Sequence, residues 1–150
     1  MELFRNDYYQ LTMEYGIFLR FKRSSVRFES LESLRCSLGL LEALLRPIQK
    51  KRYNFLFDMR KAPLRADPAF ESIVKEFQIK IELWAFKTAF LVQTTVGSAQ
   101  LNRQKRESQL GYGTFRDEPE AISYLLAESL KLPSNTNIND AFVAVRKNNG

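Results

Sequence analysis

The sequence feature that most constrains the fold is a short apolar run, Tyr53-Asn54-Phe55-Leu56-Phe57. The run is too short for an independent helix, and its nearly continuous apolar and aromatic content is typical of a strand that is covered on both faces. Asp58 ends the run, and Asp67-Pro68 supplies a helix N-cap followed by proline at the first helical position. The loop between them carries three basic residues: Arg60, Lys61 and Arg65. The pattern predicts a central strand, a basic loop and then a helix that extends to about Leu83.

A second strand-to-helix unit follows in the same order. Residues 88–93 form a short apolar strand, and the polar segment after it leads into a basic helix that ends near Ser108. The hydroxyl residues of that segment are Thr94, Thr95 and Ser98. Two such units in succession imply parallel strands with a right-handed connection, so both loops should emerge at the same edge of the sheet. Ligands and partners of open α/β sheets bind at this edge.

The remaining patterns complete a set of alternating strands and helices. Alternating residues in Tyr8–Glu14 and Ile17–Arg23, with a tight turn between them, predict an N-terminal β-hairpin. Phe18, Arg20 and Lys22 share one face of its second strand, so we expect that face to be largely wet. The other predicted elements are a leucine-rich helix that Ser30 caps and Pro47 ends, a short strand at 111–115, and a helix that Asp117 caps.

Together these elements predict an α/β fold, in which a mixed sheet of about four to five strands begins with the N-terminal β-hairpin and packs against about four helices. The patterns are complete at Leu130, so we expect one domain over residues 1–130. Residues 131–150 begin with a polar, turn-rich segment that is typical of a disordered C-terminal tail, and the alternative is that Ala141–Val145 forms a docking strand. Cys36 is the only cysteine and is expected to be a buried small hydrophobe.

The order of strands and helices, together with the segment Phe55-Leu56-Phe57-Asp58-Met59-Arg60 and the helix opening from Asp67 to Glu71, resembles the STAS superfamily. Within it, the chain looks like the stand-alone SpoIIAA-like domains over nearly the whole predicted domain. In anti-sigma-factor antagonists of this superfamily, the loop after the central strand carries an Asp-Ser pair whose serine is phosphorylated by a partner kinase. Here Asp58 is followed by Met59, and the next hydroxyl residue is Ser72, so the chain departs from that phosphorylation switch.

The composition excludes several kinds of chemistry. The chain has no histidine and one cysteine, so Ser-His-Asp and Cys-His catalysis, histidine metal sites and an internal disulfide cannot form within it. Neither of the glycine-rich phosphate-binding motifs is present. Asp58 and Asp67 could form a carboxylate pair, but a strand-end acid and a helix cap explain them better. We therefore expect no enzymatic activity, no catalytic residue, no metal site and no cofactor.

Charge and loop chemistry favour a binding function. The formal charge of +6 favours acidic partners. We expect a non-catalytic regulatory or scaffolding module that binds an acidic protein partner through the loops after the central strands and the adjacent basic faces. The residues expected to bind it are Asp58, Arg60, Lys61, Arg65, Thr94, Thr95 and Ser98. The alternative is a small-ligand or lipid carrier, since some relatives of SpoIIAA-like domains resemble lipid-binding proteins, and a cavity would favour it.

Three further expectations concern other partners and location. Nucleic-acid binding ranks third, because most aromatic residues sit at core spacing rather than among the basic clusters. Leu40 and Leu44 widen the apolar stripe of the first helix, which leaves a weak homodimer contact open. No apolar run approaches membrane-spanning length, no export signal opens the chain, and a single cysteine suits a reducing compartment, so we expect a cytoplasmic protein.

Overall fold

The computed structural model describes residues 1–108 and 111–129. The strands are β1 (Glu2–Arg5), β2 (Tyr9–Glu14), β3 (Phe18–Arg23), β4 (Asn54–Asp58), β5 (Thr88–Leu91) and β6 (Gly113–Phe115). The α-helices are α1 (Leu31–Leu45), α2 (Pro68–Trp84), α3 (Thr95–Ser108) and α4 (Glu118–Ser129), and the 3₁₀ helix η1 (Arg46–Lys51) follows α1. These elements confirm the α/β class, the N-terminal hairpin and the four predicted α-helices. The predicted tail at 131–150 lies outside the described residues.

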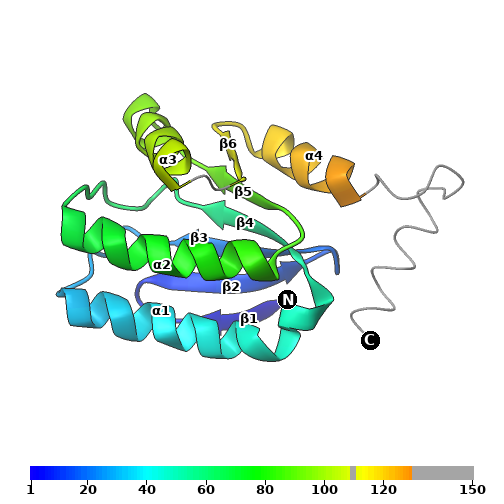
Figure 1. Cartoon of the computed structure of the whole chain (residues 1–150). Helices are drawn as coiled ribbons and strands as arrows, with labels where there is room; N and C mark the ends of the chain where they lie inside the picture. The colour runs from blue at the N-terminus through cyan, green and yellow to red at the C-terminus, as the bar shows by residue number, and fades with distance from the viewer. Residues whose placement is uncertain (109–110, 130–150) are drawn as a thin grey trace, which may run out of the picture.

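The strands form one mixed sheet in the order β1-β2-β3-β4-β5-β6. The pairs β1–β2 and β2–β3 are antiparallel, whereas β3–β4, β4–β5 and β5–β6 are parallel. The short apolar run at residues 53–57 forms most of β4, which lies inside the sheet and has all of its residues buried. Helices α1 and α2 lie side by side in front of the sheet in Figure 1. The nearly continuous apolar content of β4 therefore reflects burial on both faces.

Two hydrophobic cores lie on the two faces of the sheet. Phe55 and Phe57 of β4 belong to the larger core, which contains residues of α1 and α2. Leu56 alternates to the opposite face and packs in the smaller core with Leu125 of α4. Because side chains alternate between the two faces of a strand, neighbouring residues of β4 pack against different layers of helices. Within the described part of the chain, no helix combines the length and apolar content needed to cross a membrane.

The prediction of a largely wet face on the second hairpin strand is wrong. Phe18, Arg20 and Lys22 do share a face of β3, but Phe18 is fully buried and the side chain of Arg20 is only 13% exposed. The reason is tertiary. Strand β3 pairs with β4 on its far side and so lies inside the sheet, and α4 packs against the same face.

Two further differences concern the N-terminus and Cys36. Strand β1 pairs with β2 at the edge of the sheet and raises the described sheet to six strands, where about four to five were expected. Three of its four residues are exposed, so its sequence carries no buried pattern. Cys36 is exposed rather than buried. Helix α1 buries Leu34, Ser37 and Leu41, and Cys36 lies on the other side of the helix.

Side-chain caps fix where the helices begin. The hydroxyl of Ser30 accepts a hydrogen bond from the amide of Ser33 at 3.0 Å, and the carboxylate of Asp67 accepts from the amide of Phe70 at 3.3 Å. Asp117 accepts from the amide of Glu120 at 3.2 Å. Each cap satisfies an amide that has no partner inside its own helix. The three predicted helix starts are therefore confirmed.

Candidate functional site

A cluster of charged side chains lies at the C-terminal edge of the parallel strands, on the face that α4 covers. The side chain of Asp58, at the end of β4, is only 3% exposed. Arg60 forms a bidentate pair with it, in which Nε donates to Oδ1 at 2.9 Å and Nη2 donates to Oδ2 at 2.7 Å. Arg20 of β3 reaches the same carboxylate at 3.5 Å and also binds Glu14 and Glu118. This ion-pair cluster links β2, β3 and β4 to α4.

The pKa shifts in the ion-pair cluster follow from its pairing. Burial raises the pKa of Asp58, but the hydrogen bonds from the side chain and backbone of Arg60 and the charges of Arg60 and Arg20 outweigh burial. The pKa of Asp58 therefore lies below its ordinary value. Burial lowers the pKa of Arg20, and hydrogen bonds to Glu14 and Glu118 raise it above the usual range. Asp58 and Arg20 therefore stay charged at neutral pH, and each is paired with other members of the ion-pair cluster.

Beside the ion-pair cluster, a shallow depression opens at the same edge. The residues that line it are Lys22, Asp58, Arg60, Lys61, Gln93, Arg116 and Asp117. Each of the parallel strands contributes to it at or just after its C-terminal end, because parallel strands finish at one edge. Lys22, Lys61 and Arg116 form no ion pair with any described residue, whereas Asp58 and Arg60 are paired with each other. We call this region the edge depression.

Arg116 is a residue that the sequence interpretation missed. It follows β6, and its guanidinium donates from Nη1 to the hydroxyl of Thr95 at 3.3 Å and from Nη2 to the carbonyl oxygen of Gln93 at 3.2 Å. These bonds hold the loop after β6 beside the start of α3. A signal was present in the sequence, since a basic residue directly after a predicted parallel strand belongs at the same sheet edge as Arg60 and Lys61.

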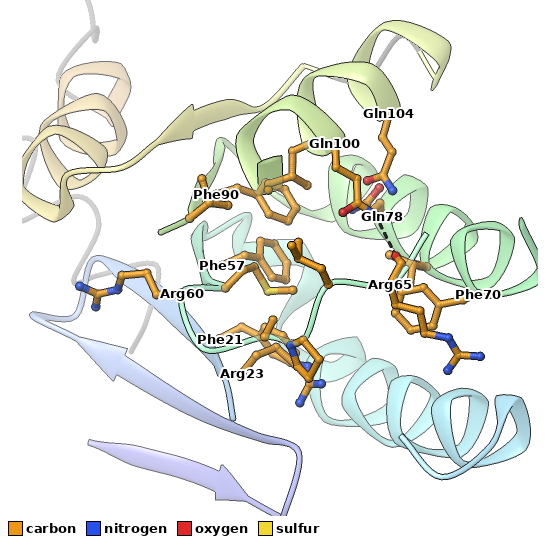
Figure 2. Close-up of a pocket in the computed structure, with 18 of the residues that line it drawn as sticks. Phe21, Arg23, Phe57, Arg60, Arg65, Phe70, Gln78, Phe90, Gln100 and Gln104 are labelled. Atoms are coloured by element: carbon orange, nitrogen blue, oxygen red, sulfur yellow. Dashed lines mark hydrogen bonds between the residues drawn. The ribbon is translucent and has the colours of Figure 1, made fainter. Parts of the chain in front are cut away.

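The structure does not gather all seven predicted site residues at one place. Arg65 pairs with Asp67 and lies over the ring of Phe70, 4.8 Å from its centroid. Figure 2 shows Arg60 and Arg65 pointing to opposite sides. Of the predicted residues, Asp58, Arg60 and Lys61 line the edge depression, and Thr95 joins them through Arg116.

The other two hydroxyl residues belong to the start of α3. The hydroxyl of Thr94 accepts a hydrogen bond from the amide of Gly97 at 3.0 Å, so Thr94 acts as a helix cap. The amide of Ser98 donates to the carbonyl oxygen of Thr94 at 3.0 Å, and the residue is half-buried in the first turn of α3. Neither Thr94 nor Ser98 lines the edge depression. Their roles in the described structure are local.

Comparison with protein-family models, with curated proteins and with solved structures gave no match for this chain. The function must therefore be inferred from the chemistry of the molecule itself. Among residues 1–108 and 111–129, no group of three or more cysteine, aspartate and glutamate side chains is arranged to hold a metal ion. The edge depression offers positive charge on a surface that the neighbouring ion-pair cluster already orders.

Proposed function

We propose that this chain is a non-catalytic regulatory or scaffolding module that binds an acidic segment of a protein partner at the edge depression. The observation that carries the proposal is the grouping of Lys22, Lys61 and Arg116, none of which has a carboxylate partner among the described residues. Arg20 and Arg60, in contrast, are engaged in the ion-pair cluster. The cluster shapes the surface, and the three unpaired cations supply the attraction.

The electrostatics of this edge suit an acidic segment. The net charge of +6 draws an acidic partner towards the protein, and the local cations orient it. Arg116 adds the planar, bidentate geometry that matches a carboxylate. Because Arg116 is bonded to Thr95, the first residue of α3, a carboxylate held by Arg116 also lies near the positive end of that helix.

The resemblance to SpoIIAA-like domains of the STAS superfamily belongs to the same proposal. A mixed sheet that begins with a hairpin and continues in parallel strands supports it, and a regulatory role without turnover follows from it. The departure at Asp58 and Met59 removes the phosphorylated serine from the scheme, so binding here depends on constant charge. A cytoplasmic location completes the proposal, because a single cysteine suits a reducing compartment.

A charge-reversal experiment tests the proposal. The partner is first captured from the native cells with the tagged protein and identified by mass spectrometry, and its affinity is then measured by calorimetry at fixed salt. We expect Lys61→Glu combined with Arg116→Glu to weaken binding at least about tenfold, or roughly 1.4 kcal/mol. The melting temperature should fall only slightly, because the two charges and the two hydrogen bonds of Arg116 are exposed and contribute little to stability.

The matched control is Lys50→Glu combined with Lys75→Glu. These residues are exposed on η1 and α2, away from the edge depression, and the change in net charge is the same. The control variant should bind the partner nearly as tightly as the wild type does. Equal weakening in both variants would leave only a general charge effect, and wild-type affinity in the Lys61 and Arg116 variant would refute the proposed surface.

A further inference from the structure

An apolar cavity of about 180 Å³ lies on the other face of the sheet, beneath the loop between β4 and α2. Phe21, Phe57 and Phe90, from three neighbouring strands, form a column along its floor, as Figure 2 shows. Their successive ring centroids are 5.3 and 4.9 Å apart, and all three side chains are buried. Leu64 of the loop lines the cavity and is 52% exposed, so the covering loop is in contact with solvent.

The polar residues that line this cavity are glutamines, arginines and Thr94. None of the described residues that line it is acidic. Arg23, Arg60 and Arg65 all line it, but Arg60 is paired with Asp58 and Arg65 is paired with Asp67. In Figure 2 the guanidinium groups of Arg60 and Arg65 point away from the phenylalanine column, one to each side, whereas Arg23 lies beside Phe21.

Arg23 is a buried cation without a counter-ion. Only 6% of the residue is exposed, and it forms no ion pair with any residue in the described part of the chain. Its guanidinium donates to the carbonyl oxygens of Tyr8 and Val26 and lies 4.6 Å from the ring centroid of Phe28. These contacts use two of the five N–H groups of an arginine. Buried charges in proteins are normally paired, since desolvation of a lone charge is costly.

We propose that this cavity binds a compact carboxylic acid in its ionised form, with an apolar, ring-sized body against the phenylalanine column and Arg23 as the counter-ion. The size follows from the volume, because an apolar cavity of about 150 Å³ is known to take up benzene. The cavity of about 180 Å³ therefore holds one ring with a short substituent. The carboxylate follows from Arg23 and from the lack of acidic lining residues, since arginine binds carboxylates in bidentate geometry.

The proposal is independent of the proposed function. Phe21 and Lys22 are neighbours on β3 and point to opposite faces, so Phe21 lines the cavity and Lys22 lines the edge depression. Arg60 and Gln93 line both, but Arg23 and the phenylalanine column belong to the cavity alone, and Lys61 and Arg116 belong to the edge depression alone. The cavity proposal gives the alternative function, a small-ligand carrier, a definite class of ligand. Partner binding at the edge depression can fail while the cavity binds its ligand, and the reverse also holds.

Two probes of nearly equal size separate the parts of the proposal. Phenylacetate carries the ring and the carboxylate, and phenylacetamide carries the same ring with a neutral group. Titrations of the full chain at neutral pH, followed by the methyl resonances of Leu34 and Val74, should show both probes in the cavity. We expect phenylacetate to bind about tenfold more tightly, because hydrogen bonds between charged groups are stronger than those to a neutral amide.

Variants of two lining arginines test the role of Arg23. Arg23→Met should remove the preference for phenylacetate, and Arg65→Met should preserve it, because Arg65 already has Asp67 as a partner. A wild type that binds the two probes equally, or that binds neither at millimolar concentration, would overturn the proposal. So would an Arg23→Met variant that folds and keeps the preference.

A second variant avoids the contacts that Arg23 makes with the backbone. Val74 of α2 lines the cavity, and Val74→Phe places a ring in the space that the ligand would occupy. We expect this variant to melt cooperatively and to weaken the binding of both probes about tenfold or more. Undiminished phenylacetate binding in Val74→Phe would show that the probe binds elsewhere, which also overturns the proposal.

Discussion

Replacing Phe55 by alanine should lower the free energy of unfolding by about 3 to 5 kcal/mol. Phe55 is 4% exposed, lies on the buried strand β4 and stacks with Phe57 at a centroid distance of 6.0 Å. Truncation removes the apolar contacts of the ring and leaves a void that the paired strands on both sides cannot fill. Since small domains are stable by only about 5 to 15 kcal/mol, the loss is a large part of the total. Urea unfolding measures it.

Phe86→Ala is the matched control for this prediction. Phe86 is the same residue type but is 47% exposed. The hydrogen bond that its backbone amide donates to the carbonyl oxygen of Tyr53 is unaffected by the substitution. We expect a loss of less than about 1 kcal/mol in the control. If Phe55→Ala proved equally mild, the assignment of β4 as the central buried strand would be rejected.

Replacing Asp58 by asparagine should cost about 3 kcal/mol at neutral pH, the lower end of the range for removing one partner of a buried ion pair. The variant leaves Arg60 without its bidentate partner and Arg20 without one of its three carboxylates. The cost stays at the lower end because Arg60 is 38% exposed and can be hydrated, and Arg20 keeps Glu14 and Glu118. Chemical unfolding of both proteins gives the difference.

The pH dependence gives this prediction a sign. The pKa of Asp58 is lower in the folded protein than in the unfolded chain, so its contribution is fully present above the ordinary carboxyl pKa. The contribution is lost as the pH falls through the folded pKa. The advantage of the wild type over Asp58→Asn should therefore be constant near neutrality and shrink below about pH 4.

Asp67→Asn controls for the loss of a carboxylate as such. Asp67 is an exposed N-cap paired with Arg65, asparagine caps a helix about as well, and exposed ion pairs contribute little. Its cost should therefore be well under that of Asp58→Asn. If the Asp58→Asn variant had the same free energy of unfolding as the wild type, the ion-pair cluster would not stabilise the fold.

The parts of the fold that the sequence predicted correctly are those with local signals. A continuous apolar run at residues 53–57 can be buried only as an inner strand, and the caps at Ser30, Asp67 and Asp117 act within a single helical turn. Strand β1 lacked such a signal, because an exposed edge strand has no hydrophobic face to detect. The position of Cys36 depended on which side of α1 faces the sheet.

The site was harder to predict because its chemistry depends on residues far apart in the chain. Arg20 and Glu118 are 98 residues apart and meet only when α4 packs on the sheet. The loop sequence suggests that Arg60 is free to bind a partner, yet the folded chain uses it to neutralise Asp58. The cavity could not be predicted from the sequence either, since phenylalanines at core spacing give the same sequence pattern in a filled core and beside a cavity.

The most direct test of partner binding at the edge depression is site-specific photocrosslinking in the native cells. A photoreactive residue replaces Lys61, which lines the edge depression, or Lys75, which is exposed on α2 outside it. We predict a crosslink from position 61 to one protein, through a peptide rich in aspartate and glutamate, and no such product from position 75. Crosslinking of the same protein from position 75 alone, or through a peptide without acidic residues, would contradict the proposed binding surface.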